Sequence, residues 1–234
     1  MIDLETGEVE ATYDIPIDFF PPVIAGTRAG LLLAGGHRDD VEAIDIATGE
    51  VRLRLPGHAP GATAIAVSEP AGLILTAIDI DGQPALVQLW RLADGVPMGT
   101  MEIPGGRHVD ALAFSRDGGR FAVSTGGTAL VYTSGERTKV GEIAFHPIFS
   151  GFDLAFTADG KGLITCQSHP ILWDIETGKL ERHFGPFSDL CHSLDVSPDG
   201  RFVVATSMGS DLRVWEIESG AFHRRLGTNV TTQP

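Results

Sequence analysis

The histidines have the widest chemical reach of any side chains in this chain, because a neutral imidazole can bind a metal ion or exchange a proton near neutral pH. There are eight, and they are spread over the sequence: His37, His58, His108, His146, His169, His183, His192 and His223. None belongs to a paired-histidine zinc motif, and the chain has no phosphate-binding glycine loop, nucleophile elbow or CxxC pair. We therefore predict no catalytic residue, no metal ligand and no cofactor.

Two short polar segments contain residue types that bind metal ions, but the spacing of these residues does not fit a metal site. Residues 79–82 (DIDG) begin like a calcium loop, but Trp90 stands at the twelfth position, where a ligating carboxylate is needed. Residues 37–40 (HRDD) combine a histidine with two aspartates. They lie where a turn between two strands is expected, and polar residues are common in turns. Both segments are expected to be turns. A metal site in a central channel, built from histidines and aspartates of several distant turns, stays open as the alternative.

A repeat organises the whole chain. A glycine closes a short apolar run at positions 7, 49, 95, 135, 178 and 220, so the period is 40 to 46 residues. A second turn glycine recurs at positions 30, 72, 118, 160 and 200. Periods of this length are typical of arrays in which each repeat is one supersecondary unit that packs on its neighbours.

The segments between these turns have the patterns of β-strands. Residues 50–55 (EVRLRL) and 179–184 (KLERHF) alternate polar with apolar, as a strand with one wet face does. Residues 163–166 and 202–206 are more uniformly apolar, as in strands covered on both faces. Each repeat is predicted to be a four-stranded antiparallel sheet. Such sheets must pack face to face around an axis, so the predicted fold class is all-β, a β-propeller.

The last two repeats carry the features of a known family. Residues 197–200 (SPDG) are followed by 214–217 (VWEI), and residues 157–160 (TADG) by 172–175 (LWDI). In these features the chain resembles the WD-repeat β-propeller family, over about residues 1–227. Earlier repeats depart from the pattern, since Trp90 is followed by an arginine and the expected tryptophan is a tyrosine or an isoleucine elsewhere. The resemblance implies a WD-repeat-like propeller with a scaffold or regulatory role.

The resemblance also implies a polar network that holds one sheet together. Members of the family often carry a Gly-His pair before the first strand, and an aspartate between the second and third strands that is tied through Ser or Thr to the tryptophan. The matching residues are His58, Thr76, Asp81 and Trp90, with Asp79 as the other candidate aspartate. The other repeats do not keep this set, so apolar packing is expected to hold them.

The chain has six glycines of the first kind and five of the second. This difference predicts that residues 1–14 form only the last two strands of a blade. Complete blades are expected at 15–56, 57–103, 104–145, 146–185 and 186–227, followed by a tail at 228–234. This chain alone is then expected to leave the ring open. The chain could be a fragment of a longer propeller, a partner could supply the missing strands, or one blade could stay incomplete. Self-association through the open seam is predicted, because about 400 Å² of uncovered apolar surface costs roughly 10 kcal/mol.

Composition narrows the classes of partner. The chain has 234 residues and a formal net charge of −14, which opposes binding to nucleic acid and to anionic membranes. It has no apolar run of about 18 residues and no secretory signal pattern, so a cytoplasmic location is expected. Cys166 and Cys191 lack metal-ligand spacing and are expected to be buried, reduced thiols.

The expected function is that of a non-catalytic protein–protein interaction scaffold, bound to a protein partner or to another domain of a parent chain. The resemblance implies that the loops entering each blade share one face with the second-to-third-strand turns. Aromatic side chains beside prolines in these loops suit protein recognition, although they could instead plug the core between blades. The predicted partner-binding residues are Phe19, Phe20, Arg38, Asp39, Arg107, His146, Phe149, His169, Phe187 and Met208. A propeller enzyme or small-ligand binder with a metal in the central channel is the alternative.

Overall fold

The computed structural model describes residues 23–27, 29–35, 40–58, 61–80, 82–145, 153–185, 187, 190–207 and 212–226. Their regular elements are β-strands, and these form five four-stranded antiparallel sheets of consecutive strands. The predicted fold class is thereby confirmed, whereas the half blade expected at 1–14 lies outside the described residues. The part of the chain that is described contains no helix long and apolar enough to cross a membrane.

The strand bounds repeat a short meander five times. Sheet 1 comprises β1 (Val23–Gly26), β2 (Leu31–Gly35), β3 (Val41–Asp45) and β4 (Val51–Leu55). Sheet 2 comprises β5 (Ala62–Ser68), β6 (Leu73–Ile78), β7 (Leu86–Arg91) and β8 (Pro97–Glu102). Sheet 3 comprises β9 (Ala111–Phe114), β10 (Arg120–Thr125), β11 (Thr128–Thr133) and β12 (Lys139–Ala144). Sheet 4 comprises β13 (Leu154–Phe156), β14 (Gly162–Cys166), β15 (Pro170–Asp174) and β16 (Leu180–His183). Sheet 5 comprises β17 (Cys191–Val196), β18 (Phe202–Ser207), β19 (Leu212–Glu216) and β20 (Phe222–Leu226).

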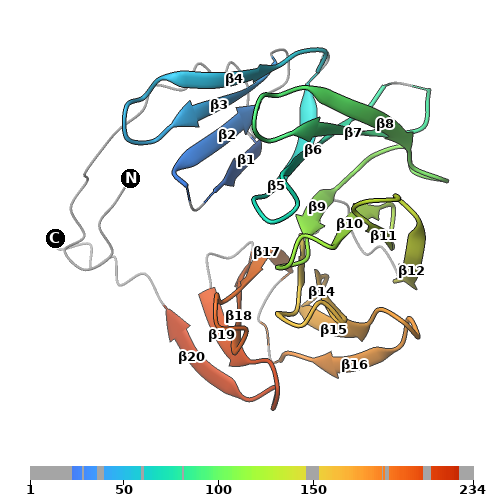
Figure 1. Cartoon of the computed structure of the whole chain (residues 1–234). Coiled ribbons are helices and arrows are strands. Elements are labelled where there is room, and N and C mark those ends of the chain that lie inside the picture. Colours follow the sequence, from blue (N-terminus) through green and yellow to red (C-terminus); the bar gives the residue numbers. More distant parts are fainter. Residues whose placement is uncertain are drawn as a thin grey trace, which may run out of the picture.

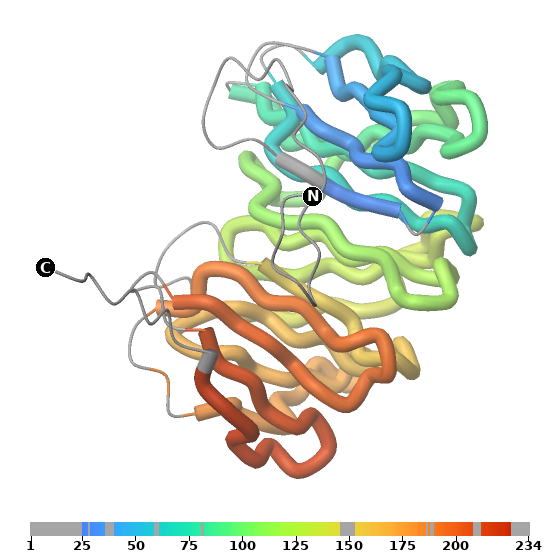
Figure 2. Tube along the Cα trace, turned by 90° about the vertical axis from the view of Figure 1, so that its left-hand side faces the viewer, coloured from blue at the N-terminus to red at the C-terminus, as the bar shows by residue number. Residues whose placement is uncertain are grey.

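The sheets are arranged radially and in chain order (Figures 1 and 2). Their first strands contact one another in the sequence β1, β5, β9, β13 and β17, so the first strand of each sheet is innermost. Within the described residues no strand of sheet 5 pairs with a strand of sheet 1, so hydrogen bonds do not close the ring there.

Each junction between neighbouring sheets holds its own apolar core. Four clusters of buried side chains lie between sheets 1 and 2, 2 and 3, 3 and 4, and 4 and 5. Between sheets 4 and 5, for example, Ile164 and Leu172 pack with Val203 and Trp215. Since a sheet buries its two faces against different neighbours, its inner strands are apolar on both sides, as the sequence pattern predicts.

Two kinds of chain reversal lie at opposite ends of every sheet. In an antiparallel meander the first and third turns share one end, which we call the turn face. The second turn and the connection to the next sheet share the other end, which we call the loop face. The five predicted first-turn glycines all have left-handed backbones, with φ between 64° at Gly72 and 81° at Gly30.

The third turns agree with the predicted repeat in four sheets and differ from it in sheet 3. Gly49, Gly95, Gly178 and Gly220 have φ of 65–73° and close their turns as predicted. In sheet 3, however, Arg137 holds the left-handed position, with φ of 58°, and its N–H donates to the Thr133 carbonyl at 3.0 Å. Aligning the repeat on Gly135 is therefore wrong by two residues.

The first turns of sheets 4 and 5 pack so closely that Gly200 has no room for a side chain. A Cβ at Gly200 would overlap the Cβ of Ala158, whereas a Cβ at Gly72 would meet no atom within 4 Å. Both glycines are left-handed, so Gly72→Ala measures the backbone strain alone, about 1 kcal/mol. Gly200→Ala adds overpacking and should cost about 2–4 kcal/mol in urea unfolding. Equal losses from the two substitutions would show that the sheets do not meet at this turn.

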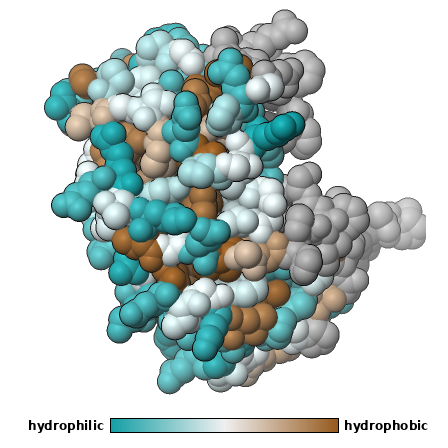
Figure 3. Space-filling view, turned by 90° about the vertical axis from the view of Figure 1, so that its right-hand side faces the viewer, coloured by the Kyte–Doolittle hydropathy of each residue, from teal (hydrophilic) through white to brown (hydrophobic). Residues whose placement is uncertain are grey.

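The outermost strands expose single apolar side chains near their third turns. Val51, Val140, Leu180 and Phe222 are each at least 39% exposed. Figure 3 views the molecule from the right-hand side of Figure 1 and shows apolar residues interspersed with polar ones. Single exposed apolar residues are normal on soluble domains and indicate no site by themselves.

Candidate functional site

A buried hydrogen-bond network in sheet 2 joins His58, Thr76 and Trp90. The side chain of His58 is fully buried, and its Nδ1 lies 2.8 Å from the carbonyl oxygen of Leu55. Because a carbonyl only accepts, Nδ1 carries the proton, and Nε2 accepts from the Thr76 hydroxyl at 2.7 Å. The indole N–H of Trp90 donates to the same hydroxyl oxygen at 2.9 Å. Both ring nitrogens of His58 are thus engaged in hydrogen bonds inside the sheet.

The aspartate of the predicted network is not among these contacts. Asp81 lies outside the described residues. Asp79, the other candidate, contacts the ring of His108 and accepts from the backbone N–H of Val109 at 3.2 Å. It thereby ties the second turn of sheet 2 to the connection that enters sheet 3.

Burial, opposed by the Leu55 hydrogen bond, lowers the pKa of His58 from 6.5, so the neutral ring is favoured.

Part of the same network recurs in sheet 4 and is missing from sheet 5. The indole N–H of Trp173 donates to the Thr165 hydroxyl at 2.9 Å. Thr76 and Thr165 each lie two residues beyond the strand partner of their tryptophan. Ala205 holds that position opposite Trp215, and among the described residues the buried indole N–H of Trp215 has no acceptor.

Supplying the missing hydroxyl should stabilise sheet 5. We expect Ala205→Thr to raise the melting temperature by roughly 2–4 °C, because one net hydrogen bond contributes about 1 kcal/mol. Ala205→Val has nearly the same shape without the hydroxyl and is the matched control for packing. If the two variants melt together, the indole N–H gains nothing from an acceptor at this position.

The loop face of sheets 2 and 3 carries a polar cluster around His108. Its ring contacts Asp79 through Nδ1, and Nε2 lies 3.6 Å from the carboxylate of Asp110. The hydrogen bond to Asp79 is the main cause of a raised pKa at His108, so this imidazole binds a proton more readily than a free one. Arg107, a predicted partner-binding residue, is exposed beside it. The cluster thus sets Arg107 and His108 beside the two carboxylates of Asp79 and Asp110.

A pair of histidines lies on the loop face of sheet 4. Nε2 of His169 lies 2.7 Å from Nδ1 of His183 at the end of β16, and its Nδ1 lies 2.8 Å from the Ser168 hydroxyl. Burial first, and the charge of His183 second, lower the pKa of His169. Two rings that share one hydrogen bond cannot both be protonated on the facing nitrogens. His169, predicted to bind a partner, is thus half-buried and held in a fixed orientation.

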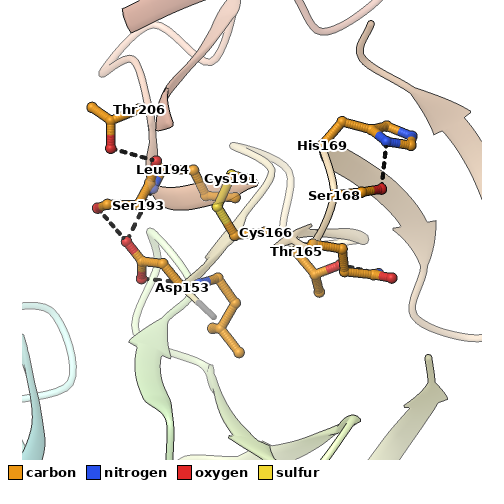
Figure 4. Close-up of a disulfide and its surroundings, with 11 residues drawn as sticks. Asp153, Thr165, Cys166, Ser168, His169, Cys191, Ser193, Leu194 and Thr206 are labelled. Carbon is orange, nitrogen blue, oxygen red and sulfur yellow. Dashed lines mark hydrogen bonds between the residues drawn. A yellow bond between two sulfur atoms is a disulfide. The ribbon is translucent and has the colours of Figure 1, made fainter. Parts of the chain in front are cut away.

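The prediction of reduced cysteine thiols is wrong in this structure, because Cys166 and Cys191 form a disulfide (Figure 4). Cys166 ends β14 and Cys191 begins β17, so the bond links sheet 4 to sheet 5 at the loop face. The two residues are 25 apart in sequence, and their Cα atoms are 5.2 Å apart. Sheet packing brings together two thiols whose spacing matches no motif, so local sequence could not reveal the pair.

A half-buried carboxylate reinforces the same junction. Asp153 accepts from the Ser193 hydroxyl at 2.7 Å and from the N–H groups of Leu194 at 3.1 Å and Leu154 at 2.9 Å (Figure 4). Burial raises the pKa of Asp153, against the lowering effect of these donors. The carboxylate therefore serves as an acceptor between the sheets, in a position that sequence reasoning did not single out.

Of the remaining predicted partner-binding residues, Phe187 lies within the described part of the chain. Phe187 packs against Trp215, with ring centroids 5.6 Å apart, and the Arg213 guanidinium lies 5.8 Å from its ring centre. This places Phe187 at the margin of the core between sheets 4 and 5. The others lie outside the described residues: Phe19, Phe20, Arg38, Asp39, His146, Phe149 and Met208.

The space at the centre of the sheets is where the alternative metal site would lie. A space of about 420 Å³ lies among the innermost strands, with Asp153, Asp195 and Arg116 as its charged residues. Arg116 contacts the carbonyl of Pro198 across the turn face. Among the described residues, no three His, Cys, Asp or Glu side chains gather closely enough to hold a metal ion.

Five radially packed four-stranded sheets define the class of protein as a β-propeller. The family model of the WD domain, G-beta repeat, matches residues 176–216. The β-propeller domain of Cps50 (Swd1) from Myceliophteria thermophila is similar in structure, with a TM-score of 0.72 and 16% identity over 89% of this chain and 72% of that chain. The chain therefore has the β-propeller fold, and its residues 176–216 match a WD repeat, in agreement with the sequence features.

In all, 1606 chains of solved structures match, so the likeness identifies a widely used fold. A search of curated proteins found no match.

Proposed function

We propose that the protein is a non-catalytic scaffold that binds a protein partner on its loop face. The observation that carries the proposal is that neighbouring loops are fixed to one another there. Asp79 holds the backbone of Val109, Asp153 holds that of Leu194, and the Cys166–Cys191 bond joins the last two sheets. A surface fixed in this way loses little conformational entropy when a partner binds.

The exposed side chains of this surface are polar and able to form hydrogen bonds. Arg107, His108, His192 and Ser193 are exposed on the loop face. Arginine is among the residues enriched where interfaces gain most of their free energy. The net charge of −14 supports a protein as the partner over nucleic acid or an anionic membrane surface.

A charge-reversal pair tests which face binds. We expect Arg107→Glu to weaken capture of the partner recovered from native extract by about 10-fold or more, the usual size of a hot-spot effect. Lys179→Glu reverses an exposed charge at the turn face and is the matched control, with no expected effect. Loss with Lys179→Glu and retention with Arg107→Glu would place the partner on the turn face and refute the proposal.

Two further measurements separate the alternatives. If a metal in the channel carries the function, metal analysis of purified protein finds a stoichiometric ion, and divalent ions raise the melting temperature. The scaffold proposal expects neither. Self-association through the seam predicts a sedimentation coefficient that rises with protein concentration; a constant monomer value would remove that expectation.

A further inference from the structure

The two histidines on the loop face of sheet 4 hold a pair of imidazole nitrogens next to each other. His169 lies in the second turn, between β14 and β15, and His183 ends β16, the outermost strand. Ile171, two residues after His169, is the strand partner of His183, so the two histidines are diagonal neighbours across β15 and β16. Nε2 of His169 lies 2.7 Å from Nδ1 of His183, and the ring centroids are 4.9 Å apart.

The separation of these two nitrogens fits a shared metal ion. A bond from a metal ion to an imidazole nitrogen is about 2.0 Å long. Two such bonds at a right angle place their nitrogens about 2.8 Å apart, whereas the tetrahedral angle places them about 3.3 Å apart. The observed 2.7 Å agrees with the right angle, which two neighbouring ligands of a tetragonal ion make. Tetragonal sites with nitrogen and oxygen ligands are typical of Cu²⁺ and Ni²⁺.

Ser168 orients the ring of His169 as metal-bound histidines are oriented. Its hydroxyl oxygen lies 2.8 Å from Nδ1 of His169. When Nδ1 donates to this oxygen, Nε2 keeps its lone pair, and this lone pair faces His183. A ligating histidine usually donates its other ring N–H to a polar partner, which fixes the tautomer and the direction of the ring. Ser168 and His169 are half-buried, whereas His183 is exposed, so solvent and ions have access to the pair.

The pair offers two protein ligands and leaves the other coordination positions to water. Among the described residues, no third His, Cys, Asp or Glu side chain completes a ligand set. Two imidazoles on one fold still bind an ion far more tightly than a single one, because the second bond is intramolecular. Cu²⁺ has the highest affinity for nitrogen ligands among the first-row divalent ions, while Mg²⁺ and Ca²⁺ prefer oxygen. The chemistry of the pair therefore favours Cu²⁺.

We propose that His169 and His183 form a two-histidine site that binds Cu²⁺ on the loop face. The ion accepts the lone pairs of His169 Nε2 and His183 Nδ1. The proton that one of these nitrogens shares with the other moves to the second nitrogen of its own ring, which is Nδ1 beside Ser168 or the Nε2 of His183. The bound ion links the second turn of sheet 4 to the end of its outermost strand. This site goes beyond the scaffold proposal, which involves no metal, and it uses no residue of the central channel.

Isothermal titration calorimetry of the full chain with Cu²⁺ tests the site. We expect one tightly bound ion per chain. His169→Asn and His183→Asn should each weaken its binding by about 100-fold, because each removes one of two linked ligands. His192→Asn removes an exposed histidine of the same face and is the matched control, with unchanged affinity expected. Tight binding that persists in both His169→Asn and His183→Asn, or an equal loss with His192→Asn, would place the ion elsewhere and overturn the proposal.

Electron paramagnetic resonance of the Cu²⁺ complex gives a second readout, which does not depend on affinity. The wild type should show the splitting pattern of two equatorial nitrogens, and His183→Asn that of one. Ser168→Ala should keep the pattern of two nitrogens and bind the ion about 10-fold more weakly, as expected when a ligating histidine loses its orienting partner. A single-nitrogen pattern in the wild type, or a pattern of two nitrogens in His183→Asn, would refute the proposal.

Discussion

Reduction of the Cys166–Cys191 disulfide should lower the melting temperature by roughly 7–14 °C. Closing a loop between residues 25 apart removes unfolded-state entropy equivalent to about 3.5 kcal/mol, and each kcal/mol shifts the melting of a chain of this size by about 2–4 °C. The effect should be concentrated in sheet 5, because the bond ties that sheet to sheet 4. Differential scanning calorimetry with and without a dithiol reductant measures it.

The control is the variant Cys166→Ala/Cys191→Ala. It should melt near the reduced wild type and should not respond to the reductant. If the wild type melts at the same temperature under both conditions, the bond does not stabilise the fold.

The disulfide and the expected cytoplasmic location oppose each other, since a reducing cytosol keeps thiols free. Alkylation of protein from native extract, without reductant, decides between them. We expect both cysteines to resist alkylation in the folded and in the denatured protein. Double alkylation after denaturation would indicate that the native location keeps the pair reduced.

Loss of the His58 imidazole should be the second large effect. We expect His58→Ala to cost about 3–5 kcal/mol in chemical denaturation, because it leaves a buried cavity and strands the Leu55 carbonyl and the Thr76 hydroxyl without partners. Thr76→Val keeps the volume and removes the shared hydroxyl, and should cost about 2–3 kcal/mol. Losses below about 1 kcal/mol for both would show that apolar packing alone holds sheet 2.

The pH dependence of that stability has a definite sign. The pKa of His58 is lowered in the fold from 6.5, so the unfolded chain binds the proton more tightly. Its contribution is fully present above pH 6.5 and is lost as the pH falls below it. His108 acts in the opposite direction: its raised pKa gives a contribution present below 6.5 that is lost as the pH rises through the folded value. His58→Gln should flatten the acid-side loss, and His108→Gln should leave it in place.

The repeat made most of the fold predictable from sequence. Glycine at a left-handed turn is a local requirement, so Gly72, Gly118 and Gly200 marked the first turns correctly. The third turn of sheet 3 was placed wrongly because Arg137 adopts the left-handed backbone that a glycine holds elsewhere. The Arg137 side chain also donates a hydrogen bond to the Met98 carbonyl of the preceding sheet, at 2.7 Å.

Only the part of the candidate site in which side chains form hydrogen bonds with one another could be predicted from the sequence. His58, Thr76 and Trp90 could be assembled from the resemblance to WD repeats. The Leu55 carbonyl that completes their network could not, because a backbone acceptor leaves no mark in the sequence. The disulfide and the Asp153 contacts depend on how two sheets meet, and such distant pairings are not encoded by local spacing. The missing acceptor of Trp215, in contrast, could have been read from Ala205 by aligning the three tryptophan repeats.

Hydrogen–deuterium exchange of the protein bound to its partner tests the scaffold account most directly. We expect slowed exchange at residues 105–110, 167–169 and 190–193 of the loop face, and unchanged exchange in the turns at 157–161 and 197–201. Protection of those turns, with the loop segments unaffected, would contradict the account.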